Sequence, residues 1–255
     1  MRASVTTRWV PRAGSNVAQY EDAFYPRVDG ARHARRLRFA VADGASESML
    51  SGLWADLLVR TWCKARRRRL PEILELAKGA WEVELAAYLE DRGRNERPIQ
   101  WFEEPGLEKG AHATLLGIAF TTAHGHPHAG AWEAIAVGDT CVMQVREGEL
   151  LSAFPLKASS EFDSAPKLVP SRPRDVERVL NAVDVERGEW RSGDTFFLLT
   201  DAVAAWFLSA YEAGGTPWDV LAGIGPEAFP GWVAARRSER SLRNDDVTVT
   251  RIEVV

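Results

Sequence analysis

Cysteine is scarce in this sequence of 255 residues, which contains only Cys63 and Cys141. Two widely separated cysteines cannot build a disulfide framework or a thiolate metal cluster, so we expect both to be buried packing residues. Long hydrophobic runs are missing too, because charges interrupt each apolar stretch within roughly ten residues, short of the about 20 that cross a bilayer. The N-terminus also lacks a signal-peptide core. We therefore expect a cytoplasmic protein without a membrane partner.

An excess of positive charge is absent as well. Lys and Arg total 32 against 36 Asp and Glu, which gives a formal net charge of −4 at pH 7. The protein as a whole therefore has no attraction for nucleic acid. The one dense basic run, Arg66 to Arg69, is interpreted as the solvated end of a helix, where cations complement the helix dipole. No nucleic-acid partner is expected.

The remaining composition is that of a globular protein with a sizeable core. Apolar residues make up 45% of the chain and charged residues 27%, which is within the usual range for such proteins. No linker, internal repeat or low-complexity segment divides the sequence. The simplest expectation is one domain over residues 1–255, since layered β-rich folds reach about 200–250 residues as single units.

Hydrophobic periodicity indicates both helices and strands. Spacings of three and four residues, or helix-favouring composition, predict helices over 50–62, 74–88, 173–182 and 202–213, and another that starts at Thr216. Short apolar or β-branched runs predict strands at 37–42, 114–122, 131–137, 140–146, 149–153, 195–200 and 247–255. We interpret 114–153 as an antiparallel meander and 92–110 as a long surface connection. Grouped helices between strands indicate an α+β layered domain.

Four aspartates stand at the edges of predicted strands: Asp22, Asp43, Asp201 and Asp245. A rigid strand end can aim a side chain at a fixed point. Carboxylates without histidine or thiolate suit hard cations, and Mg²⁺ or Mn²⁺ requires oxygen ligands of this kind. Each aspartate alone is weak evidence, because Asp is common in turns.

The context of these aspartates resembles the protein phosphatase 2C family. The matching segments follow the family's order and span about 230 residues, which gives the short motifs the sequence context that a single motif lacks. They are Glu21-Asp22-Ala23-Phe24, Phe39 to Ser46, Gly110 to Gly117, Ala136 to Thr140, Gly193 to Asp201, and Asn244 to Val249. The resemblance implies a four-layer α-β-β-α sandwich with two antiparallel sheets and a metal site at one end between the sheets.

The resemblance also implies the role of each acidic residue. Asp43 would bridge two metal ions, and the Gly44 carbonyl would add to one of them. Asp201 and Asp245 would complete the other. Glu21 and Asp22 would hold metal-bound waters. Asp139 matches an aspartate associated with a third and weaker metal. Asp246 stands where the family usually has asparagine and would be a second-shell or turn residue. For Asp139, a plain hairpin-turn aspartate is an equal alternative.

The implied activity is hydrolysis of phosphoserine or phosphothreonine, with two or three Mn²⁺ or Mg²⁺ ions as cofactors. Paired cations lower the pKa of a shared water, so that hydroxide can attack phosphorus near neutral pH without a protein nucleophile. The expected partners are a phosphorylated protein and a cognate Ser/Thr kinase in bacterial-style signalling. Two alternatives stay open: a weak or inactive phosphatase-like binding module, and a hydrolase of small phosphorylated molecules.

Two positions depart from the family pattern. An arginine commonly grips the substrate phosphate four residues before the Glu-Asp pair, and Val17 stands there in this sequence. Arg12 is the nearest upstream substitute, since guanidinium is a natural bidentate partner of phosphate. The second departure is Ala202, where the family nearly always has glycine. Alanine is harmless there if the position is helical, which the following residues favour, and costly if φ is positive.

Other candidate residues have plainer interpretations. His124, His126 and His128 alternate and could chelate zinc, but Gly125 and Pro127 between them favour an exposed turn. His112 could donate a proton to the leaving group, although a packed neutral histidine explains it as well. Ser46 and Ser48 are interpreted as helix caps, because no Ser-His-Asp arrangement accompanies them.

Overall fold

The computed structural model describes residues 1–65, 69–162, 165–172 and 176–255. Most of the basic run 66–69 and the start of the helix predicted at Pro173 lie outside these residues. None of the helices in the described ranges combines the length and the apolar character that crossing a membrane requires.

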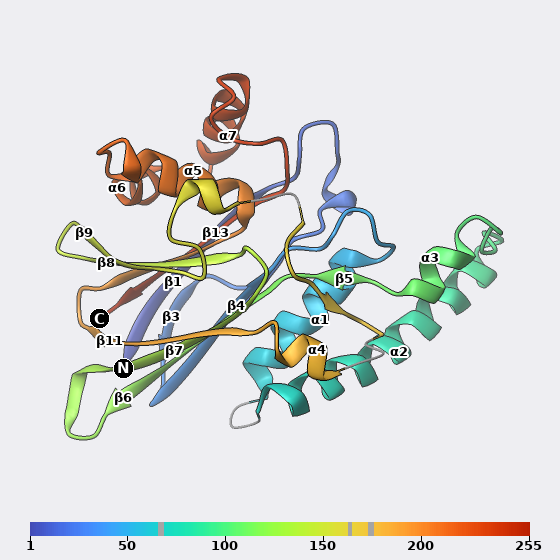
Figure 1. Ribbon diagram of the computed structural model, residues 1–255, viewed down its shortest axis with the longest axis horizontal. Coiled ribbons are helices and arrows are strands. Elements are labelled where there is room, and N and C mark those ends of the chain that lie inside the picture. The colour runs from blue at the N-terminus through green and yellow to red at the C-terminus, as the bar shows by residue number, and fades with distance from the viewer. Residues whose placement is uncertain (66–68, 163–164, 173–175) are drawn as a thin grey trace.

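Two antiparallel sheets form the centre of the fold (Figure 1). The six-stranded sheet has the order β3 (Gly30–His33), β1 (Arg2–Val10), β13 (Val247–Val254), β12 (Thr195–Leu199), β8 (Cys141–Arg146), β9 (Glu149–Phe154). The five-stranded sheet has the order β11 (Asp184–Arg191), β7 (His126–Val137), β6 (Leu115–Ala123), β4 (Arg36–Ala42), β2 (Ala23–Tyr25). A short pair, β5 (His112–Ala113) and β10 (Val169–Pro170), completes the strands of the described residues.

Aromatic side chains fill the space between the two sheets. Phe39 and Phe120 come from the five-stranded sheet, and Phe196 and Ile252 come from the six-stranded sheet; all four are buried. The Phe120 and Phe196 rings meet edge to face with centroids 4.8 Å apart, a favourable geometry for aromatic pairs. This packing fixes the two sheets face to face, so that loops from both meet at one end.

Helices cover the outer faces of both sheets (Figure 1). On the five-stranded sheet lie α1 (Ser51–Lys64), α2 (Leu70–Arg94) and α4 (Val176–Leu180). On the six-stranded sheet lie α5 (Asp201–Glu212), α6 (Pro217–Gly223) and α7 (Phe229–Ser238). The remaining helical segments of the described residues are α3 (Glu104–Lys109) and the 3-10 turns η1 (Val17–Gln19) and η2 (Ser159–Glu161). The arrangement confirms the predicted α+β class with antiparallel sheets.

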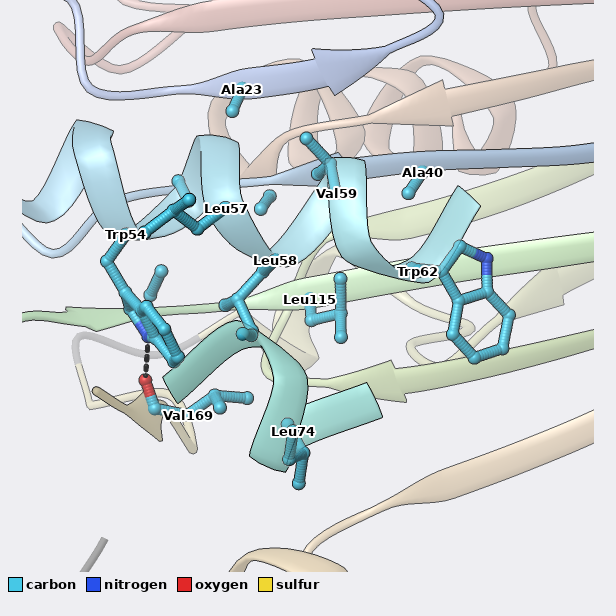
Figure 2. Close-up of a cluster of buried hydrophobic side chains, with 14 of the residues drawn as sticks. Ala23, Ala40, Trp54, Leu57, Leu58, Val59, Trp62, Leu74, Leu115 and Val169 are labelled. Carbon is cyan, nitrogen blue, oxygen red and sulfur yellow. Dashed lines mark hydrogen bonds between the residues drawn. The ribbon is translucent and has the colours of Figure 1, made fainter. Parts of the chain in front are cut away.

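The apolar face of α1 explains why this helix packs where it does. Trp54, Leu58 and Trp62 recur at helical spacing and are buried against strands β4 and β6 and helix α2. Figure 2 shows these side chains together, with the indole of Trp54 donating a hydrogen bond to the Val169 carbonyl at 2.8 Å. Helix α1 is thereby attached to β10 as well as to the sheet.

Three expectations about the elements are corrected. The meander over 114–153 is two hairpins in different sheets, because the chain crosses from the five-stranded to the six-stranded sheet between β7 and β8. The surface connection 92–110 contains the end of α2 and all of α3. Ser46 and Ser48 do not cap α1, whose N-cap is Leu50 in the left-handed conformation.

Candidate metal centre

The ends of strands from both sheets bring the predicted aspartates to one pocket. Asp43 directly follows β4. Asp201 lies two residues after the end of β12, and Asp245 lies two residues before the start of β13; the antiparallel pairing of these strands puts the end of β12 beside the start of β13. Asp139 lies at the crossing from β7 to β8. All four line a pocket of about 730 Å³. The structure therefore brings Asp43, Asp139, Asp201 and Asp245 to one place, and their role as metal ligands stays a prediction.

Asp43 is fixed by the backbone around it. Its N–H donates to the Thr114 hydroxyl at 2.9 Å, and the Thr114 N–H donates to the Asp43 carbonyl at 2.8 Å. The hydroxyls of Thr114 and Thr140 share a further bond of 2.6 Å. Burial, followed by the charges of the neighbouring aspartates, Asp22 first, raises the pKa of Asp43 well above its usual value.

Gly44 occupies a space that excludes a side chain. A Cβ at this position would lie 2.7 Å from the Ser51 carbonyl carbon and 2.8 Å from the Glu21 carbonyl oxygen. The Gly44 N–H donates to that same Glu21 oxygen at 3.2 Å. The absence of a side chain therefore lets the Asp43-Gly44 turn pack directly on the start of α1 and on the segment that carries Glu21 and Asp22.

Asp22 is almost completely buried, with 3% of its surface exposed. Its Oδ2 accepts hydrogen bonds from the hydroxyls of Thr248 at 2.6 Å and Thr200 at 3.0 Å. Its Oδ1 is also buried and has no hydrogen-bond partner among the described residues. Burial is the main cause that raises the pKa of Asp22 well above its usual value, and the Thr248 bond opposes it. A buried carboxylate oxygen in this state is costly unless a proton or a cation meets it.

Asp201 starts helix α5 and is held at two points. The Ala202 N–H donates to its Oδ1 at 2.5 Å, and the Arg243 Nη1 lies 3.7 Å from its Oδ2. Burial, then the charges of Asp139 and Asp245, raise the pKa of Asp201 to about 7, against the opposing charge of Arg243. Ala202 is helical and buried, which agrees with the interpretation that alanine is harmless at this position.

Asp246 contacts the backbone and does not line the pocket. Its Oδ1 accepts from the Arg12 N–H at 2.7 Å, and its Oδ2 accepts from the Glu21 N–H at 2.6 Å. The neighbouring Asp245 Oδ1 accepts from the Asp246 N–H at 2.9 Å. Asp246 thus ties the segment before β2 to the start of β13. This geometry is consistent with the second-shell assignment, which stays a prediction.

The side chains of Glu21 and Arg12 meet at Ser46. The Ser46 hydroxyl donates to Glu21 Oε2 at 2.7 Å and accepts from Arg12 Nη1 at 3.0 Å. The other Glu21 oxygen accepts from the Ser51 hydroxyl, and Arg12 Nε donates to the Ser15 hydroxyl at 3.1 Å. These bonds bring Arg12 to the edge of the site, since Ser46 lines the pocket. Its predicted contact with phosphate is untested.

The acidic residues fit a divalent hard cation in their chemistry. Among the described residues, no three His, Cys, Asp or Glu side chains already stand in an arrangement that would hold a metal ion. The donor set is nonetheless all oxygen, and the unpartnered Asp22 Oδ1 lies in a cluster of mutually repelling carboxylates. A cation would give the Asp22 Oδ1 a partner and would reduce the repulsion among the carboxylates. The three histidines are exposed, as predicted, but only His124 lies in the turn of the β6–β7 hairpin; His126 and His128 belong to strand β7.

The structure adds residues to the pocket that sequence reasoning did not place there. Lys109, at the end of α3, and Arg243, between α7 and β13, both line it. His112, which the sequence offered as a proton donor, lines the pocket as well. The wall also includes Ala165, Pro166 and Leu168. For Arg243 one signal was present in the sequence, because it stands two residues before Asp245.

Comparison with known proteins identifies the family and the fold of the chain. The model of the family described as "Protein phosphatase 2C" matches residues 16–221. No curated protein sequence shows a significant match. Among solved structures, the chain is similar to the Mycobacterium tuberculosis serine/threonine phosphatase PstP/Ppp, with TM-score 0.52, 18% identity, and coverage of 100% of this chain and 99% of the other.

Two further structures share the fold. The serine/threonine phosphatase of S. agalactiae has TM-score 0.53 and 13% identity, with coverage of 98% of this chain and 100% of the other. RsbX, solved in complex with magnesium, has TM-score 0.51 and 12% identity, with coverage of 100% and 96%. The family match includes Asp22, Asp43, Asp139 and Asp201, and Asp245 lies beyond its end. With most of its length matched by the family model, the chain belongs to the protein phosphatase 2C family.

Proposed function

We propose that this chain is a metal-dependent protein phosphatase that hydrolyses phosphoserine and phosphothreonine. The observation that carries the proposal is the gathering of Asp43, Asp139, Asp201 and Asp245 around one pocket in a member of the protein phosphatase 2C family. Asp22 adds to this set, because its charge is close enough to raise the pKa of Asp43. The expected fold unit is the whole chain, residues 1–255.

The acidic residues would take different positions around the Mg²⁺ or Mn²⁺ ions. Asp43 and the Gly44 carbonyl would hold one side, and Asp201 and Asp245 the other, at one end between the sheets. Asp139 would serve a third ion, and Glu21 and Asp22 would act through bound water. Two ions held there would supply hydroxide near neutral pH and neutralise charge on the phosphoryl oxygens. The magnesium in the RsbX structure supports this choice of cation.

The chain's own residues orient the carboxylates. The Thr114 hydroxyl anchors the backbone of Asp43, and the Ala202 N–H aligns one oxygen of Asp201. Ser46 and Ser51 hold both oxygens of Glu21. Bonds of this kind fix the geometry of metal ligands and are expected to contribute about 10–100-fold to metal affinity or activity. No protein nucleophile is required, since water attacks phosphorus.

The substrate class follows from the family and from the fold relatives. A phosphorylated protein is the proposed substrate, and a Ser/Thr kinase that produces it is the corresponding partner. The names of the two serine/threonine phosphatases that share the fold support this choice.

Hydrolysis of para-nitrophenyl phosphate and of a phosphothreonine peptide, with Mn²⁺, Mg²⁺ or EDTA, tests the proposal. We expect metal-dependent turnover that Asp43→Asn and Asp201→Asn abolish, because each substitution removes a charged ligand from the pocket. Asp219→Asn on the exposed face of α6 is the matched control and should retain full activity. Absence of turnover in the wild-type protein with either metal would refute the enzyme assignment.

A second candidate is a phosphatase-like binding module. The observation that favours it is Val17, which is 66% exposed where the family commonly has an arginine. Arg12 does not simply replace that arginine, because its guanidinium donates to Ser15 and Ser46. Calorimetric Mn²⁺ binding without turnover of either substrate would favour this candidate.

A further inference from the structure

Binding of a phosphorylated substrate in this pocket requires more positive charge than two metal ions supply. Five aspartates surround it or lie against it, and a phosphate monoester adds further negative charge at neutral pH. Even with two divalent cations in place, the carboxylates leave little net attraction for such a substrate. The chain itself must then contribute cations that attract the phosphate, a conclusion that rests on the proposed function.

In the described part of the chain, Arg12, Arg237 and Arg243 lie near the acidic cluster, and the first two donate hydrogen bonds to acceptors of the protein. Arg12 donates to the hydroxyls of Ser15 and Ser46. Arg237 donates to the carbonyls of Pro11 and Asp245, which fastens α7 to the loops that flank the site. Arg243 differs from both.

Arg243 lines the pocket, and its side chain is 48% exposed. Its one ion pair within the described residues joins Nη1 to Asp201 Oδ2 at 3.7 Å, which is longer than a hydrogen bond. The guanidinium is therefore drawn to the site by charge, while its N–H groups stay available to a ligand. A guanidinium presents a rigid fork of donors that matches two phosphate oxygens.

Lys109 lies on another wall of the same pocket. It is the last residue of α3, and its side chain is exposed with no ion-pair partner in the described part of the chain. The following Gly110 has φ of 78° and packs against the side chains of Ser171 and Arg172. This turn fixes the position from which the lysine side chain leaves the backbone. A lysine ammonium contributes a point charge and fewer oriented donors than a guanidinium.

We propose that Arg243 is the phosphate-binding residue of this chain, with Lys109 as a second and weaker contact to the same phosphoryl group. Arg243 then supplies the cation that Val17 does not. Because the guanidinium already lies beside Asp201, a phosphoryl group bound by Arg243 is placed next to the carboxylates proposed to hold the metal ions.

The test is calorimetric binding of inorganic phosphate to the Mn²⁺-loaded protein, together with calorimetric binding of Mn²⁺. For Arg243→Ala we expect the phosphate Kd to rise about tenfold or more, because a charge-assisted bond is lost. Mn²⁺ affinity should be unchanged or higher, since Asp201 loses a competing cation. Arg243→Lys should give an intermediate phosphate Kd, and Lys109→Ala a rise of about threefold. Arg240→Ala is the matched control, because Arg240 is exposed in the same loop outside the pocket.

Two results would overturn the inference. One is a phosphate Kd that is the same in Arg243→Ala as in the wild type, whatever the change in Mn²⁺ affinity; Arg243 would then only balance the charge of Asp201. The other is a wild-type protein that binds Mn²⁺ but no phosphate. Because these measurements need no turnover, failure of the phosphatase activity is distinguishable: Arg243-dependent phosphate binding without hydrolysis would support the inference and refute the proposed function.

Discussion

The hydroxyl of Thr248 donates a hydrogen bond of 2.6 Å to Oδ2 of Asp22. The donor belongs to β13 of the six-stranded sheet, and the acceptor directly precedes β2 of the five-stranded sheet. This bond therefore joins the two sheets beside the candidate metal centre. It also holds a carboxylate whose second oxygen is buried and unpartnered among the described residues.

Replacing Thr248 by valine keeps the shape of the side chain and removes this donor. We expect a loss of about 1–3 kcal/mol in the free energy of unfolding, because the buried acceptor is left with fewer bonds. We also expect a loss of about tenfold in Mn²⁺ affinity, since the carboxylate is less well oriented. Urea denaturation and calorimetry measure the two effects.

Thr250→Val on the same strand is the control. Its hydroxyl shares a bond of 3.0 Å with the Thr7 hydroxyl, which is neutral and only half-buried. The expected cost is below about 1 kcal/mol, with unchanged Mn²⁺ affinity. Equal effects of the two valines on Mn²⁺ binding would show that Thr248 has no special role at the site.

Gly44→Ala is predicted to disturb the site through packing alone. The added methyl would lie 2.7 Å from the Ser51 carbonyl carbon, and backbone atoms cannot move aside as a flexible side chain can. Overpacking of this kind costs about 1–3 kcal/mol. The displacement of Asp43 should also weaken Mn²⁺ binding. Thermal unfolding and calorimetry measure both.

The matched control is Gly79→Ala in helix α2. A Cβ there meets no atom within 4 Å, so alanine should stabilise the helix by about 0.5–1 kcal/mol. The two substitutions are thus expected to change stability in opposite directions. A Gly44→Ala protein as stable as the wild type would contradict the close packing described above.

The sequence predicted the acidic pocket residues because each belongs to a short motif at a strand end. Asp43 follows an apolar run and precedes glycine, and Asp201 follows another such run. Those local patterns fix where the strands end, and the antiparallel pairing of β12 with β13 then brings Asp201 to Asp245. Only this approach of Asp201 to Asp245 depends on tertiary structure.

Other parts of the fold have no comparable local signal. Strand β11 is an edge strand with alternating charges and mostly exposed side chains, so its sequence does not show strand periodicity clearly. Helix α3 contains Pro105 and Gly106 and has six residues, which made 92–110 look like a loop. Arg243 is near Asp201 only because the chain after α7 folds back onto the end of β12, and no spacing rule predicts that contact.

Trp54 and Trp81 lie in the same buried environment, so a comparison of the two measures what one indole hydrogen bond contributes to stability. Both rings are buried with 1% exposure and meet edge to face at 5.9 Å. The Trp54 indole donates to the Val169 carbonyl (Figure 2), whereas the Trp81 indole has no partner among the described residues. We expect Trp54→Phe to cost about 1–2 kcal/mol more than Trp81→Phe, as measured by urea denaturation. Equal costs would mean that the Val169 bond contributes nothing to stability.

The Arg146–Asp194 ion pair is expected to make the free energy of unfolding depend on pH in the acidic range. Arg146 Nε lies 2.6 Å from Asp194 Oδ1, and Gln144 and the Arg191 N–H donate to Oδ2 at 2.9 and 3.0 Å. Burial raises the pKa of Asp194, but the hydrogen bonds from Arg146, Arg191 and Gln144 outweigh it, so the pKa is below its usual value.

A carboxyl whose pKa is lower in the folded protein stabilises it above the unfolded value of about 3.9, and this contribution is lost as the pH falls through the folded value. Asp194→Asn should therefore lower the free energy of unfolding by about 2–4 kcal/mol near pH 7, and the difference from wild type should narrow between about pH 5 and pH 3. Glu133→Gln removes an ion pair of the same 2.6 Å length whose partners are exposed, and it should cost below about 1 kcal/mol at neutral pH. A difference between wild type and Asp194→Asn that stays constant as the pH falls would show that the Asp194 charge does not contribute to the stability of the folded state.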